Sequence, residues 1–256
     1  MSKPGSTGYG WRAPAIVVAA GCLITIIGFG VRASFGLFLE PMTVDNGWTR
    51  ESFAIAIAIQ NLLWGLGVPV AGMLADRFGP VPVIAVGGVI YALGMLGMAN
   101  ADSAFMLSMT AGLLTGIGVA FTSFSLALAA MAKVVRPEKR STVMGLGTAA
   151  GSFGQVIFSP LAYWFIQDFG WFGALYCLAA ITLVLLPLAF MLPNLKAGDV
   201  TDEYDQTMPE ALREALGNKS YGLLTTGFFV CGFHVAFVVT HFPAYVKDQG
   251  LAVETG

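Results

Sequence analysis

A single arginine lies inside a long apolar run near the start of the chain. Arg32 falls within an apolar segment at about 14–39, which is long enough to cross a bilayer as a helix. At 1.5 Å per residue it lies roughly 8–9 Å from the midpoint of that helix. Charges at membrane depth are costly and usually functional, and a guanidinium can bind a carboxylate through two parallel hydrogen bonds. We therefore expect Arg32 to bind an organic anion, with snorkelling toward the headgroups as the alternative.

Other polar residues fall at similar depths in other apolar runs. Each alone is typical of a hydrogen bond between membrane helices, but together with Arg32 they predict a polar layer that faces a common cavity. The expected members are Gln60, Asn61, Thr122, Ser123 and Gln155. Four of these, all except Thr122, are predicted to contact substrate.

A histidine lies near the middle of the apolar run at 221–243. By spacing, His234 shares a helical face with Gly227, Cys231 and His241. Its side chain could take up a proton or donate to an anion, which makes it a further expected substrate contact. A neutral histidine bonded to a neighbouring helix is the alternative.

The chain lacks the residue patterns of enzymes, metal sites and nucleic-acid binders. Its three cysteines stand in apolar runs without CxxC spacing, and no HExxH occurs. We find no pairing of a nucleophile with a base and no phosphate loop. The 13 Lys and Arg against 15 Asp and Glu give no basic excess. We therefore expect no catalytic residues, cofactor, metal or nucleic-acid partner.

The composition indicates an integral membrane protein. Hydrophobic residues make up 56% of the 256 residues and charged residues only 11%, against roughly 25% charged in an average soluble domain. Because no alternating ten-residue pattern supports a barrel, the spans are predicted to be helices. Seven are expected, at about 14–39, 52–74, 81–99, 104–132, 141–166, 171–192 and 221–243.

Helix-end signals and basic residues predict where these spans begin and end and how they are oriented in the membrane. Glu40-Pro41 is predicted to end the first span, and Thr49 to cap the second. With the N-terminus inside, ten basic residues fall in inner segments, whereas only Arg50 and Lys247 fall outside. This bias predicts a cytoplasmic N-terminus in a plasma membrane, or in the inner membrane of a bacterium.

A polar segment divides the chain into three predicted parts. The range 193–220 carries six acidic residues, and Thr207-Met208-Pro209-Glu210 resembles a capping box, which predicts a short helix at about 208–217. We expect a six-helix bundle over 1–192 and an acidic cytoplasmic linker over 193–220. A seventh span with an outer tail would occupy 221–256.

The loop after the second span carries the most specific motif. Gly72-Met73-Leu74-Ala75-Asp76-Arg77-Phe78-Gly79 resembles the G-x-L-A-D-R-x-G loop of the major facilitator superfamily, although Pro80 and Pro82 follow where that family has basic residues. The resemblance implies that Asp76 and Arg77 are gating residues, which latch this half of the transporter to the other half when it faces outward. A charged turn that only fixes topology is the alternative.

Three further stretches, 116–121, 136–147 and 169–172, are similar to the monocarboxylate branch and its oxalate/formate relatives. Phe172 stands where that branch usually has arginine. The resemblance implies a secondary transporter of small organic anions that works by alternating access, with a proton as one candidate coupling ion. The family has twelve spans in two halves, so we expect a chain truncated after the seventh span that lacks its C-terminal half and is inactive alone. The alternative is a seven-helix receptor or sensor.

Overall fold

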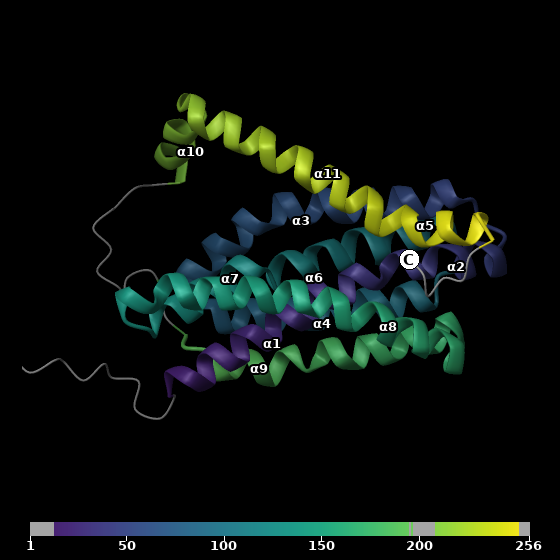
Figure 1. Ribbon diagram of the computed structural model, residues 1–256, viewed down its shortest axis with the longest axis horizontal. Helices are drawn as coiled ribbons and strands as arrows, with labels where there is room; N and C mark the ends of the chain where they lie inside the picture. The colour runs from purple at the N-terminus through teal and green to yellow at the C-terminus, as the bar shows by residue number, and fades with distance from the viewer. Residues whose placement is uncertain (1–12, 195, 197–207, 251–256) are drawn as a thin grey trace, which may run out of the picture.

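The computed structural model describes residues 13–194, 196 and 208–250, and every regular element in these ranges is a helix (Figure 1). The predicted all-α class is therefore confirmed. Six helical segments are long and apolar enough to cross a membrane, namely Pro14–Asn46, Arg50–Phe78, Pro80–Ala99, Ala104–Lys133, Pro137–Met191 and Lys219–Asp248.

The first segment runs further than the sequence suggested. Helix α1 (Pro14–Ala33) continues through the 3₁₀ turn η1 (Ser34–Phe38) into α2 (Leu39–Asn46). The prediction that Glu40-Pro41 ends this helix is wrong. Pro41 lies in the first turn of α2, where a missing N–H is tolerated. The helix ends instead at Gly47, which has a φ of 66°.

The second and third segments meet in a joint that only glycine fits. Helix α3 (Arg50–Phe78) begins at Thr49, whose side chain accepts a hydrogen bond from the Ser52 amide, so this predicted cap is confirmed. Helix α4 (Pro80–Ala99) follows Gly79 directly. Gly79 has a φ of 90°, and a Cβ there would lie 1.8 Å from Oδ1 of Asn194. The Asn194 amide bonds both sides of the joint, to the Phe78 carbonyl and the Val81 amide.

The fourth segment is helical but irregular. It consists of α5 (Ala104–Leu107), the π-helical η2 (Ser108–Leu114), α6 (Thr115–Phe121) and α7 (Phe124–Lys133). The chain leaves helical geometry at Thr122 and Ser123, between α6 and α7. This break falls at the depth where the sequence predicted a polar layer, and such irregularities are frequent at functional sites.

The fifth segment crosses the bundle twice. Helix α8 (Pro137–Leu183) contains Gly170 with a φ of 69° and a ψ of 171°, which is not helical. The chain turns back there and ends in α9 (Leu185–Met191) (Figure 1). Helix α1 packs against both arms of this turn, and Gly154 of α8 lies so close to α1 that a Cβ would be 2.3 Å from the Ile26 carbonyl oxygen.

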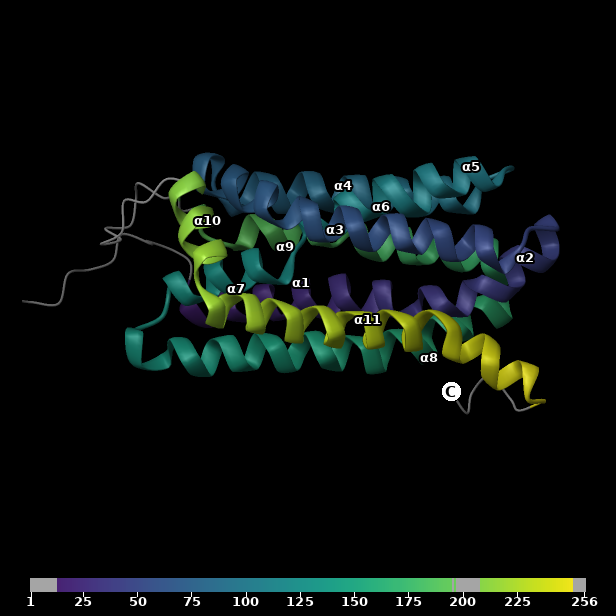
Figure 2. The ribbon, with the colours of Figure 1, turned by 90° about the horizontal axis from the view of Figure 1, so that it is seen from above.

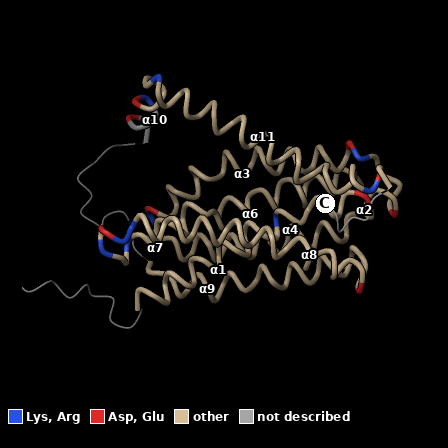
Figure 3. The backbone as a smooth tube through the Cα atoms, in the orientation of Figure 1, with Lys and Arg blue, Asp and Glu red and all other residues tan. Residues whose placement is uncertain are grey.

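Helix α11 (Lys219–Asp248) contacts the bundle at one end only. It follows the short helix α10 (Met208–Gly217). Thr240, Ala244 and Val246 are buried, whereas residues 221–235 are exposed. In Figure 1 the helix approaches the bundle near α2 and diverges from the other helices toward α10, and in Figure 2 it runs along the bundle between α3 and α8 in the view. We call the end of the bundle that holds α2 the Glu40 end, and the opposite end, toward α10, the Asp76 end. Figure 3 shows that most charges gather at these two ends.

Candidate functional site

The guanidinium of Arg32 is held by two side chains of α3. Its Nη2 donates a hydrogen bond to Oδ1 of Asn61, and Cζ lies 4.3 Å from the centroid of the Trp64 ring. Asn61 is fixed in turn, because its Nδ2 donates to the Ile57 carbonyl at 2.9 Å. The arginine therefore faces the bundle rather than the headgroups. Its Nε is buried and has no hydrogen-bond partner in the described part of the chain.

A cavity of about 860 Å³ opens beside this guanidinium. Its polar lining comes from Arg32 of α1, Asn61 of α3 and Gln155 of α8. The side-chain amide of Gln155 makes no hydrogen bond to any described residue, and so its donor is available. The rest of the lining is mostly apolar or aromatic and includes Phe29, Trp64, Phe228, Phe229, Phe233, Val235 and Val239.

A second, much smaller cavity lies on another side of Arg32. It holds about 10 Å³ and is lined by Gly28, Trp64, Thr122 and Ser123 among others. That volume admits about one water molecule. The structure thus brings Ser123 close to Arg32, on the wall of this small cavity rather than in the large one.

Two buried polar side chains lie deeper in the bundle. Gln60 is 1% exposed and its Nε2 has no hydrogen-bond partner among the described residues. Tyr91 of α4 is fully buried, its hydroxyl is also unpaired there, and it interacts electrostatically with Arg32. Sequence reasoning missed Tyr91, although a tyrosine in the middle of an apolar span is itself a signal, because its hydroxyl needs a partner.

The structure does not bring His234 to the cavity. Its ring is exposed, and Nδ1 lies 2.8 Å from the Val230 carbonyl of its own helix. The neighbouring Phe233 and Val235 line the cavity instead. Its role as a substrate contact stays a prediction.

Asp76 and Arg77 lie exposed at the end of α3, away from the cavity. Arg77 Cζ is 5.2 Å from the Phe78 ring, and neither charge forms an ion pair with a described residue. Their gating role stays a prediction.

Four charges at the Glu40 end form pairs that the sequence did not reveal. Lys247 Nζ lies 2.7 Å from Oε1 of Glu40, and Arg50 bonds both carboxylate oxygens of Asp248 at 2.7 and 2.9 Å. Arg50 and Asp248 are 198 positions apart, so no local pattern could have paired them.

Several crossing helices around a largely apolar cavity with one buried guanidinium define a multi-pass α-helical membrane protein. The chain belongs to the Major Facilitator Superfamily, whose sequence profile matches residues 20–256. The expected family and fold are confirmed.

Individual relatives agree. Monocarboxylate transporter 13 of Bos taurus is 32% identical over 97% of this chain and 57% of its own length, and Homo sapiens monocarboxylate transporter 11 is 29% identical over 97% and 52%. The inward-open xylose transporter XylE from E. coli superposes with a TM-score of 0.60 at 16% identity, over 90% of this chain and 57% of XylE. The chain spans about half the length of the curated relatives it matches. No observation favours the receptor alternative.

Proposed function

We propose that the protein containing this chain transports small organic anions, monocarboxylates in particular, by alternating access. The observation that carries the proposal is the Arg32 guanidinium, the one charged group among the described residues that line the 860 Å³ cavity. A substrate carboxylate in the cavity would pair with it through a charge-assisted hydrogen bond. The names of the monocarboxylate transporter relatives support this substrate class.

The cavity lining matches the two parts of such a substrate. Arg32 and the Gln155 amide present donors toward a carboxylate, while Trp64 and Phe233 line the space that a short apolar tail would fill. Nη2 is already committed to Asn61 and Nε is buried, and so Nη1 remains for the ligand. A guanidinium anchored in this way binds a carboxylate at a low cost in side-chain entropy.

The transport cycle would use the two ends of the bundle in turn. We place the Asp76 end in the cytoplasm, because ten of the basic residues fall in segments on that side. Asp76 and Arg77 would then close the cytoplasmic side in the outward-facing state. Binding between two bundles near the membrane midplane is the general arrangement of such carriers, and the second bundle would supply the remaining walls of the cavity.

Uptake in cells that express the full-length protein tests the proposal. We expect saturable uptake of a short monocarboxylate such as lactate, competed by other monocarboxylates but not by the matching neutral amide. Arg32→Gln should abolish most of this uptake, whereas Arg213→Gln, which removes an exposed arginine of α10, should leave it intact. Equal competition by the neutral amide would refute anion recognition.

A further inference from the structure

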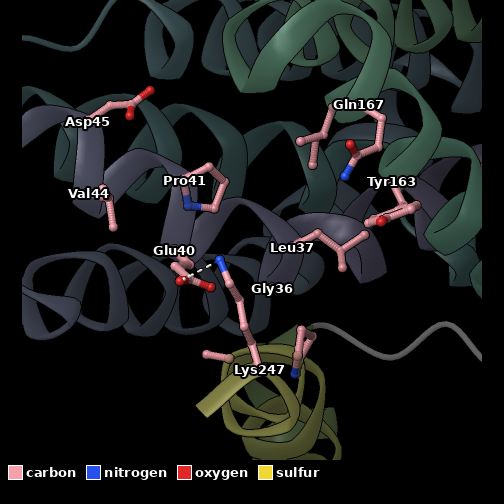
Figure 4. A pocket seen from close by; sticks show the side chains of 12 residues that line it. Gly36, Leu37, Glu40, Pro41, Val44, Asp45, Tyr163, Gln167 and Lys247 are labelled. Atoms are coloured by element: carbon pink, nitrogen blue, oxygen red, sulfur yellow. Dashed lines mark ion pairs between the residues drawn. The ribbon is translucent and has the colours of Figure 1, made fainter. Parts of the chain in front are cut away.

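Helix α11 is fastened to the bundle by its last turns. Its contacts are with η1 and α2, at the Glu40 end. There Lys247 forms an ion pair with Glu40 of α2, as the dashed line in Figure 4 shows. The next residue, Asp248, pairs in bidentate fashion with Arg50 at the start of α3. Two adjacent residues of α11 thus bind two different helices of the bundle.

A close helix contact accompanies these ion pairs. Gly36 of η1 lies against the backbone of α11, and a Cβ at Gly36 would be 2.1 Å from the Val239 carbonyl oxygen. Val239 also lines the 860 Å³ cavity. The contact therefore closes the cavity wall next to the ion pairs, and any side chain larger than hydrogen at position 36 must push the two helices apart.

The opposite end of α11 forms no such ion pairs with the described residues of the bundle. Residues 221–235 are exposed, and the helix leaves the bundle toward α10 (Figure 1). Cys231 lies on this free part and lines the cavity. A reagent that enters from the Asp76 end would reach its thiol, whereas one that enters from the Glu40 end would first meet the contacts of Gly36, Glu40 and Arg50.

We propose that Glu40, Arg50, Lys247 and Asp248 form a two-pair latch that holds the extracellular side of the cavity shut while the cytoplasmic side is open. The proposal rests on the alternating-access function proposed above. The latch must also release for the outward-facing state, and its strength suits that need. The side chains of Arg50, Asp248 and Lys247 are about half exposed, at 50%, 50% and 54%. An exposed pair shifts an equilibrium by only about two- to fivefold.

Thiol labelling of Cys231 tests the latch without any substrate. In the full-length protein, every cysteine other than Cys231 is replaced, and a membrane-impermeant maleimide is added either to intact cells or to inside-out vesicles. We expect fast labelling from the cytoplasmic side and slow labelling from outside. Glu40→Lys and Lys247→Glu should each raise the outside rate by about fivefold or more, because a like-charge pair replaces an attractive one. The double swap should restore much of the slow rate but not all of it, because the new charges then face Arg50 and Asp248.

Two further variants sharpen the result. Gly36→Val should raise outside labelling without any change of charge. Lys219→Glu makes the same charge change as Lys247→Glu at the far end of α11 and should alter nothing. Outside rates that stay unchanged in both single reversals, or that are as high in the double swap as in the single reversals, overturn the latch. Equally fast labelling of the unmodified protein from both sides also overturns it.

Labelling and uptake separate the two proposals. If lactate uptake fails while Cys231 labelling follows the charges, the latch stands and the substrate class is wrong. If uptake depends on Arg32 while labelling ignores Glu40 and Lys247, the substrate class stands and the latch is wrong.

Discussion

Replacement of Arg32 by glutamine is the most direct test of the candidate site. Glutamine keeps a polar N–H at about the position of the Arg32 Nε. It removes the positive charge and both Nη groups, including Nη2, which now donates to Oδ1 of Asn61. Alanine is a poorer choice, because it would also remove the aliphatic stem of the side chain and its packing.

The size of the effect follows from the lost interaction. A hydrogen bond to a charged group contributes about 1.5–3 kcal/mol, so the affinity for a monocarboxylate should fall by about 10- to 150-fold. Arg32→Lys keeps the charge but loses the planar fork that bridges Asn61 and the ligand. We expect it to fall between the parent and Arg32→Gln.

The assay is titration calorimetry of the purified full-length protein with a monocarboxylate and with its neutral amide. Thermal unfolding of each variant in detergent checks that the fold survives. Arg213→Gln, on the exposed face of α10, controls for loss of an arginine elsewhere. The reasoning fails if Arg32→Gln weakens the acid and the amide equally, or if it binds the acid as tightly as the parent does.

Three other outcomes are expected. Gly118→Ala should lower the unfolding temperature, because its Cβ would lie 2.6 Å from the Tyr91 backbone and overpacking costs about 1–3 kcal/mol. The control Gly145→Ala has open space around the new Cβ and should instead stabilise the fold by up to about 1 kcal/mol. Tyr91→Phe should leave the unfolding temperature unchanged or raise it, since the hydroxyl has no partner among the described residues; a clear fall would reveal an unseen one, such as water. The 256-residue chain reconstituted alone should show no lactate flux in vesicles, and robust substrate-specific flux would contradict the need for a second bundle.

The sequence predicted the helical class, the family and the Thr49 cap because these depend on composition and local pattern. Pro41 shows where a local rule misleads. A proline breaks a helix when it lies in the helix interior, but it is tolerated in the first turn. Helix α2 begins at Leu39, so Pro41 lies in its first turn. The π-helical turn at Ser108–Leu114 had no signal that distinguishes it from a regular helix.

Which side chains would meet was harder to predict. In a soluble helix the apolar stripe shows the buried face, whereas a helix in a membrane is apolar on the lipid side as well. The sequence therefore predicted how deep a residue lies along its span, but it did not predict toward which side of the helix the side chain points. Arg32, Asn61 and Gln155 do line one cavity, whereas His234, at a similar depth, does not. The pairs at Glu40 and Arg50 depend on tertiary contact alone.

The placement of charge is compatible with the alternating-access cycle proposed above, in which two states of similar free energy exchange. Arg32 is the charge at membrane depth, and both side chains that hold it belong to α3 of the same bundle. A swing of α11 would change the apolar wall of the cavity while leaving the guanidinium paired, so no buried charge would lose its partners during the motion. The charges that would separate in the proposed cycle, such as Lys247 and Glu40, lie at one end of the bundle and are 54% and 25% exposed, so water can replace each partner. Because no buried charge would lose its partners in either state, a substrate carboxylate that binds one state slightly more tightly would shift the equilibrium between the two states.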